Sequence, residues 1–284
     1  MRMCACRGTA GFAHVSCLAE QAKILVDEAD QNNKDAKWAL WQRCKLCGQK
    51  HHGVVMHALG WLCWKTYLIR ADSGAAKLWM LNESMTTLGL GLMEGDKYDE
   101  ARIVFEAQIA ELRRAGDVPD GVIIDAQCNL AACYGNLRLH QKALALFREL
   151  HAKRMAMHGP TPNTLHMACN LGKSLVENGL RTEGIAFLRD QLPHTRRLGP
   201  DHEVSFVLRT DLAKALYFFD APRAYLIEAL DIFTDVHKRA RRVMGASHPI
   251  TTDAGDMIRR AQLALQLFEA HEGNLEAHRR LQGN

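Results

Sequence analysis

The segments NLAACYGNLRLHQKA, residues 129–143, and NLGKSLVENGLRTEG, residues 170–184, align along their whole length and decide how the chain folds. Two further segments fit the same alignment, TLGLGLMEGDKYDEA at 87–101 and DLAKALYFFDAPRAY at 211–225. The second residue of each segment is a leucine, and each leucine is followed by a small residue. These pairs are Leu88–Gly89, Leu130–Ala131, Leu171–Gly172 and Leu212–Ala213, in steps of 42, 41 and 41 residues. A fixed period of this length indicates a repeated supersecondary unit.

A second set of equivalent residues follows in the later part of each unit. Its small members are Ala101, Ala143, Gly184 and Ala229, and the bulky residues four positions later are Phe105, Phe147, Leu188 and Phe233. Apolar residues in these segments recur at i, i+3, i+4 and i+7, which is the spacing of one helix face. The interval is four residues longer in the last unit, so we place an insertion around Phe219–Arg223, with Pro222 inside the turn. The pattern predicts about four stacked helical hairpins, a mainly α fold of the solenoid type.

The connections between hairpins also recur. They are HGPTPNT at 158–164, LGPDHEVS at 198–205 and MGASHPITT at 244–252, and each has a glycine where a helix C-cap is expected. Asp201, Ser247, Thr161 or nearby residues are then candidates to cap the helix that follows.

The units resemble tetratricopeptide repeats (TPRs) over about residues 76–265. The period and the G-x-x-H-P-x-T signature at Gly245, His248, Pro249 and Thr251 resemble the kinesin light chain subtype, and the other two connections match that signature in part. The resemblance implies an α-solenoid whose concave face binds extended or helical peptides. Residues 266–284 are then a C-terminal tail.

The same resemblance implies which residues line the concave groove. They stand before the leading leucines, at Asn129, Asn170 and Asp211, while Lys173 and Lys214 follow two of those leucines. An asparagine amide there can hydrogen-bond to a peptide backbone of any sequence. A mixed groove with two lysines favours an acidic peptide.

The first 50 residues contain paired metal-ligand residue types. They occur as Cys4-x-Cys6, His14-x2-Cys17 and Cys44-x2-Cys47. Closely spaced thiolates and imidazoles are what tetrahedral zinc requires, so the spacing predicts a zinc-binding module.

The order C-x-C-x7-H-x2-C-x26-C-x2-C resembles the later part of a RING-CH finger, here spanning residues 1–53. The resemblance implies one four-thiolate site made by Cys4, Cys6, Cys44 and Cys47. The family's first cysteine pair would precede Cys4, so His14 and Cys17 lack their ordinary partners: either the chain is truncated at its start or the site recruits a substitute. The nearby substitutes are His51, His52, His57 and Cys63. A third option joins His14 and Cys17 to Cys44 and Cys47 and leaves the first two cysteines free.

A helix and a polar loop are expected between Cys17 and Cys44, with Trp38 and Trp41 packed on the finger. Residues 54–75 are expected to form a connector helix that joins the finger to the first hairpin.

These features favour an adaptor that binds zinc and docks peptides or proteins in the repeat groove. The alternative is a RING-CH-type ubiquitin ligase that recruits a ubiquitin-conjugating enzyme and uses the repeats to select substrates. Because Gly48 follows the last cysteine, no cationic side chain is available there to hold ubiquitin. Basic clusters such as 237–242 fit the cationic last turn of a helix better than a nucleic-acid surface.

Composition narrows the remaining classes. Hydrophobic residues make up 48% and charged residues 24% of the 284 residues, and the net charge is +4. The most apolar stretch, 54–69, is shorter than the roughly 20 residues that a membrane span needs. Nine cysteines without a secretory signal indicate reduced thiols or metal ligands. We therefore expect a soluble cytoplasmic or nuclear protein with no membrane partner.

Overall fold

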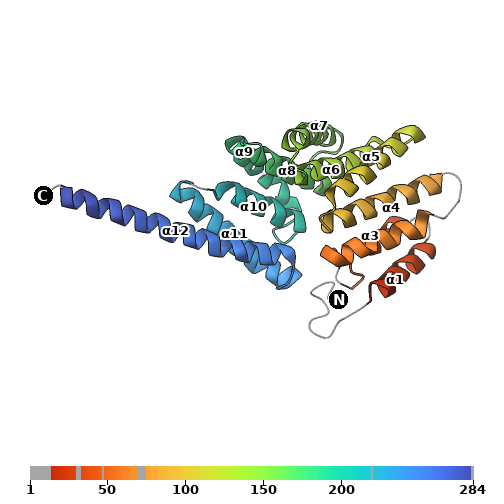
Figure 1. The fold of residues 1–284 in the computed structure, drawn as a ribbon, viewed down its shortest axis with the longest axis horizontal. Coiled ribbons are helices and arrows are strands. Elements are labelled where there is room, and N and C mark those ends of the chain that lie inside the picture. The colour runs from red at the N-terminus through yellow and green to blue at the C-terminus, as the bar shows by residue number, and fades with distance from the viewer. Residues whose placement is uncertain (1–13, 30–32, 47, 69–74, 219, 283–284) are drawn as a thin grey trace. The chain divides into compact units, whose positions relative to one another are not determined.

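The computed structural model describes residues 14–29, 33–46, 48–68, 75–218 and 220–282, and it is helical almost throughout (Figure 1). The helices of this part are α1 (Val15–Asp27), α2 (Lys34–Trp38), η2 (Ala39–Trp41), α3 (Gly53–Leu68), α4 (Ala75–Glu94), α5 (Tyr98–Ala115), α6 (Asp120–Asn136), α7 (His140–His158), α8 (Pro162–Glu177), α9 (Arg181–Gln191), η3 (Leu192–Arg197), α10 (Glu203–Leu216), α11 (Arg223–Met244) and α12 (Pro249–Gln282). Within the described ranges no strand forms, so the predicted mainly α fold is confirmed. None of the helices searched there is long and apolar enough to cross a membrane.

The chain divides into two compact units. The first unit comprises Met1–Met157 and the second unit His158–Asn284. The hairpins α4–α5 and α6–α7 belong to the first unit, and the hairpins α8–α9 and α10–α11 belong to the second.

The small residues that follow the leading leucines and the bulky residues of the second set contact one another inside the hairpins. A side chain at Gly89 on α4 would overlap with the ring of Phe105 on α5, and one at Gly172 on α8 would overlap with Leu188 on α9. The bulky residue of the second helix therefore occupies the space that the small residue of the first helix leaves open. All four bulky residues of this register are buried, at 0 to 3% exposure. The predicted hairpin packing is confirmed.

The turns inside the hairpins differ in length as expected. Three residues separate α4 from α5, α6 from α7 and α8 from α9, whereas α10 ends at Leu216 and α11 begins only at Arg223. Pro222 directly precedes α11 with φ −54°, a conformation that suits the residue before a helix. The insertion predicted from the spacing is therefore a longer turn.

In the connections between hairpins, a glycine follows the end of one helix and a capping side chain precedes the next. Gly159, Gly199 and Gly245 have φ values of +65°, +89° and +91°, the left-handed region that glycine adopts without strain. Thr161 caps α8, because its side chain accepts a hydrogen bond from the Thr164 N–H at 3.3 Å. In the other two connections a histidine does this, which the sequence analysis did not single out.

Histidine Nδ1 is the acceptor in both cases. His202 accepts from the Val204 N–H and His248 from the Ile250 N–H, each at 3.2 Å. Asp201, which we expected as a cap, instead pairs with Arg239 and Arg242 of α11 at 3.2 and 2.5 Å.

The N-terminal part of the first unit has an apolar core of its own. Trp38 and Trp41 are 2% and 0% exposed and pack with α1 and with Leu59 and Tyr67 of α3. The rings of Trp38 and Tyr67 lie 4.5 Å apart between centroids. The tryptophans predicted to pack on a metal finger thus form a core against α1 and α3.

Helix α3 lies directly against α4. A side chain at Gly60 would come within 2.9 Å of the Thr87 carbonyl oxygen, and one at Gly91 within 2.8 Å of the Met56 carbonyl oxygen. The two backbones approach closely because these glycines lack side chains. The predicted connector therefore packs on the first repeat helix along its length.

Candidate functional site

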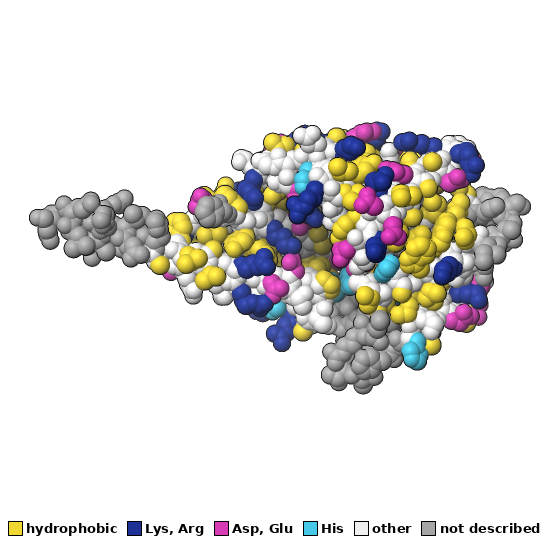
Figure 2. Space-filling view, in the orientation of Figure 1, with side chains coloured by type: hydrophobic (Ala, Val, Ile, Leu, Met, Phe, Trp, Pro, Cys, Tyr) yellow, Lys and Arg dark blue, Asp and Glu magenta, His cyan; other side chains and the backbone are white. Residues whose placement is uncertain are grey.

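The helices α8 and α10 of the second unit are the first members of successive hairpins, and α12 follows the second of these hairpins. Helix α8 packs on α10, and α10 also touches α12. An ion pair links the last two, because Lys214 Nζ of α10 lies 2.8 Å from Asp253 Oδ2 of α12. Over α10 to α12 the visible surface carries acidic and basic side chains next to one another (Figure 2).

Four of the five predicted groove residues lie on two of these helices. Asn170 and Lys173 stand on α8, and Asp211 and Lys214 stand on α10. Each pair is separated by three positions, so its members lie on one face of their helix. Asn170 and Asp211 are partly buried, whereas both lysines are exposed.

Asp211 is the electrostatic centre of this face. Burial raises its pKa to about 7, the positive charges of Lys214 and Lys173 oppose that rise, and the negative charges of Asp253 and Glu177 add to it. Near neutral pH this carboxyl is therefore about half protonated, and it can donate or accept a hydrogen bond.

The two lysines already have carboxylate partners. Lys173 Nζ lies 3.7 Å from Glu177 Oε1, and Lys214 pairs with Asp253 as described above. The ionisable groups of this surface are thus two cations, Lys173 and Lys214, and three acids, Asp211, Glu177 and Asp253. We name these five residues together with Asn170 the α8–α10–α12 face. This charge balance carries no excess of positive charge, contrary to the preference for acidic peptides that the lysines alone suggested.

Glu177 and Asp253 are not among the groove residues predicted from the sequence. Glu177 follows Lys173 by four residues, a spacing that favours an ion pair on a helix, and could have been found. Asp253 belongs to another helix, and only tertiary packing brings it to Lys214.

Asn129 is the fifth predicted groove residue. It is partly exposed on α6 of the first unit, whereas the others belong to the second unit.

Of the six predicted zinc ligands, Cys4, Cys6 and Cys47 lie outside the described residues. His14 directly precedes α1 and Cys17 lies in its first turn, with 3.9 Å between His14 Nδ1 and Cys17 Sγ. Two such atoms bound to one tetrahedral zinc are separated by roughly 3.6 Å, given ordinary bond lengths. This pair therefore fits the geometry of zinc ligands.

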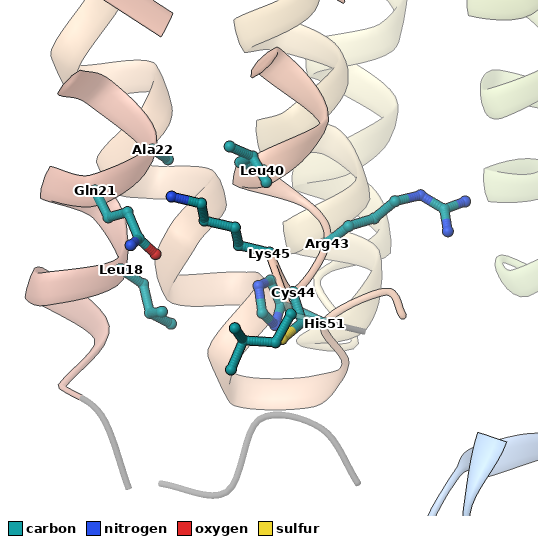
Figure 3. A pocket seen from close by; sticks show the side chains of 9 residues that line it. Leu18, Gln21, Ala22, Leu40, Arg43, Cys44, Lys45 and His51 are labelled. Carbon is teal, nitrogen blue, oxygen red and sulfur yellow. The ribbon is translucent and has the colours of Figure 1, made fainter. Parts of the chain in front are cut away.

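Cys44 begins a tight turn. The Gly48 N–H donates to the Cys44 carbonyl at 2.8 Å, the Cys44 N–H donates to the Gln49 carbonyl at 2.8 Å, and Gly48 has φ +70°. Cys44 is 6% exposed and lines a cavity of about 50 Å³ between this turn and α1. In Figure 3 the His51 ring lies beside the Cys44 sulfur, on the same side of that cavity.

The substitute ligands occupy varied surroundings. His51 is 3% exposed, and His52 Nδ1 lies 3.9 Å from Glu94 Oε1. The His57 ring packs against Gly95, and Cys63 is fully buried in the N-terminal apolar core. In the described ranges, histidine, cysteine and acidic side chains do not gather in a group of three that could hold a metal ion.

The basic run at 237–242 contains two arginines that are paired. Arg239 contacts Asp235 at 3.0 Å as well as Asp201, and Arg242 contacts Asp201. These contacts tie α11 to the connection before α10.

No protein-family model matches the chain, and no curated protein matches it. Among solved structures, the Rap conjugation gene regulator of the plasmid pLS20, in complex with the Phr* peptide, is similar with 12% identity and a TM-score of 0.50, covering 91% of this chain and 76% of that one. This similarity shows a shared fold.

Two further solved structures are similar to this chain. Nearly identical TPR-like repeats of a proposed kinesin light chain from Podosopora anserina match with 17% identity, a TM-score of 0.48, and 81% and 98% of the two chains. BtubC (BKLC) from P. vanneervenii matches with 12% identity, a TM-score of 0.45, and 90% and 93% of the two chains.

Proposed function

We propose that the chain is an interaction adaptor that binds a peptide segment of a partner protein on the α8–α10–α12 face. The observation that carries the proposal is the partly buried pair Asn170 and Asp211, placed on neighbouring helices and flanked by exposed lysines. The Rap regulator shares the fold and was solved with a peptide, which supports this class of partner by analogy of fold alone.

The chemistry of the face suits a peptide backbone. The Asn170 amide can donate and accept hydrogen bonds, and Asp211 can do the same because its pKa is raised to about 7. Neighbouring first helices of stacked hairpins lie about 10 Å apart, so the two groups can contact backbone sites roughly three residues apart in an extended guest.

The flanking ion pairs can exchange partners with a guest. In the pairs Lys173–Glu177 and Lys214–Asp253 every side chain is at least 30% exposed. Because water screens such charges, each ion pair contributes at most about 1 kcal/mol to stability. A guest with charges of both signs therefore replaces these contacts at small cost.

A randomised peptide library selected on the full chain tests the proposal. The enriched peptide is then synthesised and titrated against Asn170→Ala and Lys214→Glu, and we expect each change to weaken binding roughly tenfold, about 1.4 kcal/mol. Lys238→Glu, at an exposed position of α11, is the matched control and should bind as the parent does. Enriched peptides that bind all three variants like the parent would refute the proposed face.

We also propose that the N-terminal segment holds zinc. His14 and Cys17 fit a shared ion, and Cys44 with the predicted Cys4, Cys6 and Cys47 supplies further thiolates. Bound zinc would supply structural cross-linking there.

Metal analysis of the purified chain by mass spectrometry tests this second proposal. Cys17→Ser and Cys44→Ser should each reduce the zinc content and lower the melting temperature, whereas Cys128→Ser on α6 should do neither. A metal-free parent protein after expression with zinc would contradict it. The ubiquitin-ligase alternative gains no support from the described residues and stays a hypothesis.

A further inference from the structure

A large hollow in the first unit is lined by acids and tryptophans. Its volume is about 540 Å³, within the usual range of small-molecule sites, and α2, α4 and the α5–α6 connection form its walls. Three of its lining residues are acidic: Asp35, Glu83 and Asp117. Among the described residues that line it, none is basic. The residues that line the hollow therefore carry a net negative charge when these acids are ionised.

Its aromatic wall is built from Trp38 and Trp79. Their ring centroids lie 5.1 Å apart at an interplanar angle of 75°, and the Trp79 Nε1–H donates to Asp35 Oδ1 at 3.1 Å. The Lys34 ammonium lies 4.6 Å from the centroid of the Trp79 ring. An ammonium of the chain itself thus occupies a cation–π position on this wall, and a guest cation would displace Lys34 or bind on the part of the ring that Lys34 leaves open.

Glu83 is the most buried of the three acids, because Asp35 and Asp117 are exposed. It is partly buried on α4, and the Asn82 amide donates to its Oε1 at 3.1 Å. Gln108 of α5 in turn donates to the Asn82 side-chain oxygen at 2.8 Å and to the Asn82 carbonyl at 3.1 Å. These contacts fix the orientation of Asn82 beside the Glu83 carboxyl.

We propose that this hollow binds an organic cation with an apolar stem, an ammonium or a guanidinium that lies between Trp79 and the carboxyls of Glu83 and Asp35. The aromatic wall takes the stem and the face of the cation, and the carboxylates take its N–H groups. A lysine or arginine side chain of a guest peptide has this chemistry, and so does a free polyamine. The site lies in the first unit and is independent of the face proposed for peptide binding.

Binding at this hollow depends on pH in a defined direction. Burial raises the pKa of Glu83 to about 7, the negative charges of Asp35 and Asp125 add to the rise, and the Asn82 hydrogen bond opposes it. A bound cation favours the ionised carboxylate and so releases a proton. Affinity therefore increases roughly tenfold from pH 6 to pH 8, as the free carboxyl ionises.

The other ionisable groups around Glu83 do not reverse this direction. Asp125 of α6 pairs with Arg154 of α7 at 2.6 Å, and Asp117 is exposed at the rim. Cys63 of α3 is buried, and burial raises the pKa of its thiol well above the ordinary value, so it stays neutral in this pH range.

Nuclear magnetic resonance of the full chain gives a local test through the indole N–H signal of Trp79, which a Trp79→Phe variant assigns. The probes are a capped arginine tripeptide, a capped lysine tripeptide, spermidine, and a capped norleucine tripeptide as the neutral analogue. We expect saturable shifts of the Trp79 signal with the cationic probes and at least tenfold weaker shifts with norleucine. A response to the capped peptides alone identifies a side chain as the source, and a response to spermidine alone identifies a free amine.

Two variants separate charge from shape. Glu83→Gln keeps the volume and the Asn82 contact but should weaken the cationic probes about tenfold at pH 8 and remove the pH dependence. Asp35→Asn, which keeps an acceptor for Trp79, should weaken them less. Glu111→Gln, on α5 and not among the residues that line the hollow, should change nothing. Equal binding of norleucine, or unchanged binding in Glu83→Gln with a native circular dichroism spectrum, would overturn the proposal.

Discussion

Glu83 in the first unit and Asp211 in the second are both partly buried carboxyls with a pKa raised to about 7, but their neighbours differ. The charges that act on Glu83 are those of Asp35 and Asp125, both negative. Asp211 has the same kind of acidic neighbours together with Lys173 and Lys214. Burial therefore raises both values, while only the second unit supplies cations of its own that oppose the rise.

This difference separates two kinds of binding surface. Around Asp211 the charges of the chain nearly balance, so a guest must exchange existing ion pairs and hydrogen bonds. Around Glu83 the residues that line the hollow include three acids and no basic residue, and the Lys34 ammonium on the Trp79 wall offsets only part of this charge, so a further cation is favoured. The same pKa value thus reports two different electrostatic environments, and the identity of the neighbours is what distinguishes them.

The largest expected effect is on stability and comes from Asp211→Asn. The folded-state pKa lies above the ordinary value of 3.8, so ionisation opposes folding, and this cost grows from about pH 4 to pH 7 and is complete above it. The variant should therefore raise the free energy of unfolding at pH 8 by about 2 to 4 kcal/mol, allowing for partial solvent exposure, and leave it nearly unchanged at pH 4. Urea denaturation at both pH values measures this, and an equal change at both would contradict the assignment.

Glu83→Gln is also expected to raise the free energy of unfolding at pH 8, by a smaller amount. Its pKa rises from an ordinary value of 4.5 to about 7, so the gain in unfolding free energy at pH 8 is about 1 to 3 kcal/mol and fades towards pH 4. The control Glu111→Gln only breaks an exposed ion pair with Arg114 and should change stability by less than about 1 kcal/mol. A loss of stability in Glu83→Gln at pH 8 would mean that a cation already neutralises Glu83.

Lys214→Met tests whether the cations of the second unit set its balance. Removing the stronger of the two opposing charges, and leaving Asp253 without its partner, should raise the pKa of Asp211 by about one pH unit. Lys173→Met should raise it less, because Lys173 acts more weakly on Asp211. Carbon-detected titration of the Asp211 carboxyl measures both, and an unchanged pKa in Lys214→Met would show that burial alone controls it.

Asp35→Asn is expected to have the smallest effect and removes one of the two negative charges that act on Glu83. Without that negative charge the pKa of Glu83 should fall by about half a pH unit, because Asp35 is the largest charged contributor to the rise. The same carboxyl titration detects it. A fall below about 5.5 would instead assign most of the rise to Asp35 and leave little to burial.

Most features of the repeat could be predicted from local sequence rules. The small residue of the first helix and the bulky residue of the second, such as Gly89 with Phe105, recur at one period because each pair fills one contact between helices. The positive-φ glycines followed from the same rules, since few other residues adopt that conformation. The caps were harder to predict: His202 and His248 accept through a ring nitrogen, which depends on the tautomer and on the path of the chain.

The sequence by itself determined which residues face one another within a hairpin and which pairs, such as Asn170 with Lys173, share a helix face, because both follow from the helical period. Only the tertiary structure decided that Asp253 meets Lys214, that Trp38 and Trp41 pack against α1 and α3, and that Asp35 and Glu83 line the same hollow. These contacts join segments that no local period relates. Their effect on charge also depends on burial, which arises only when the helices pack together.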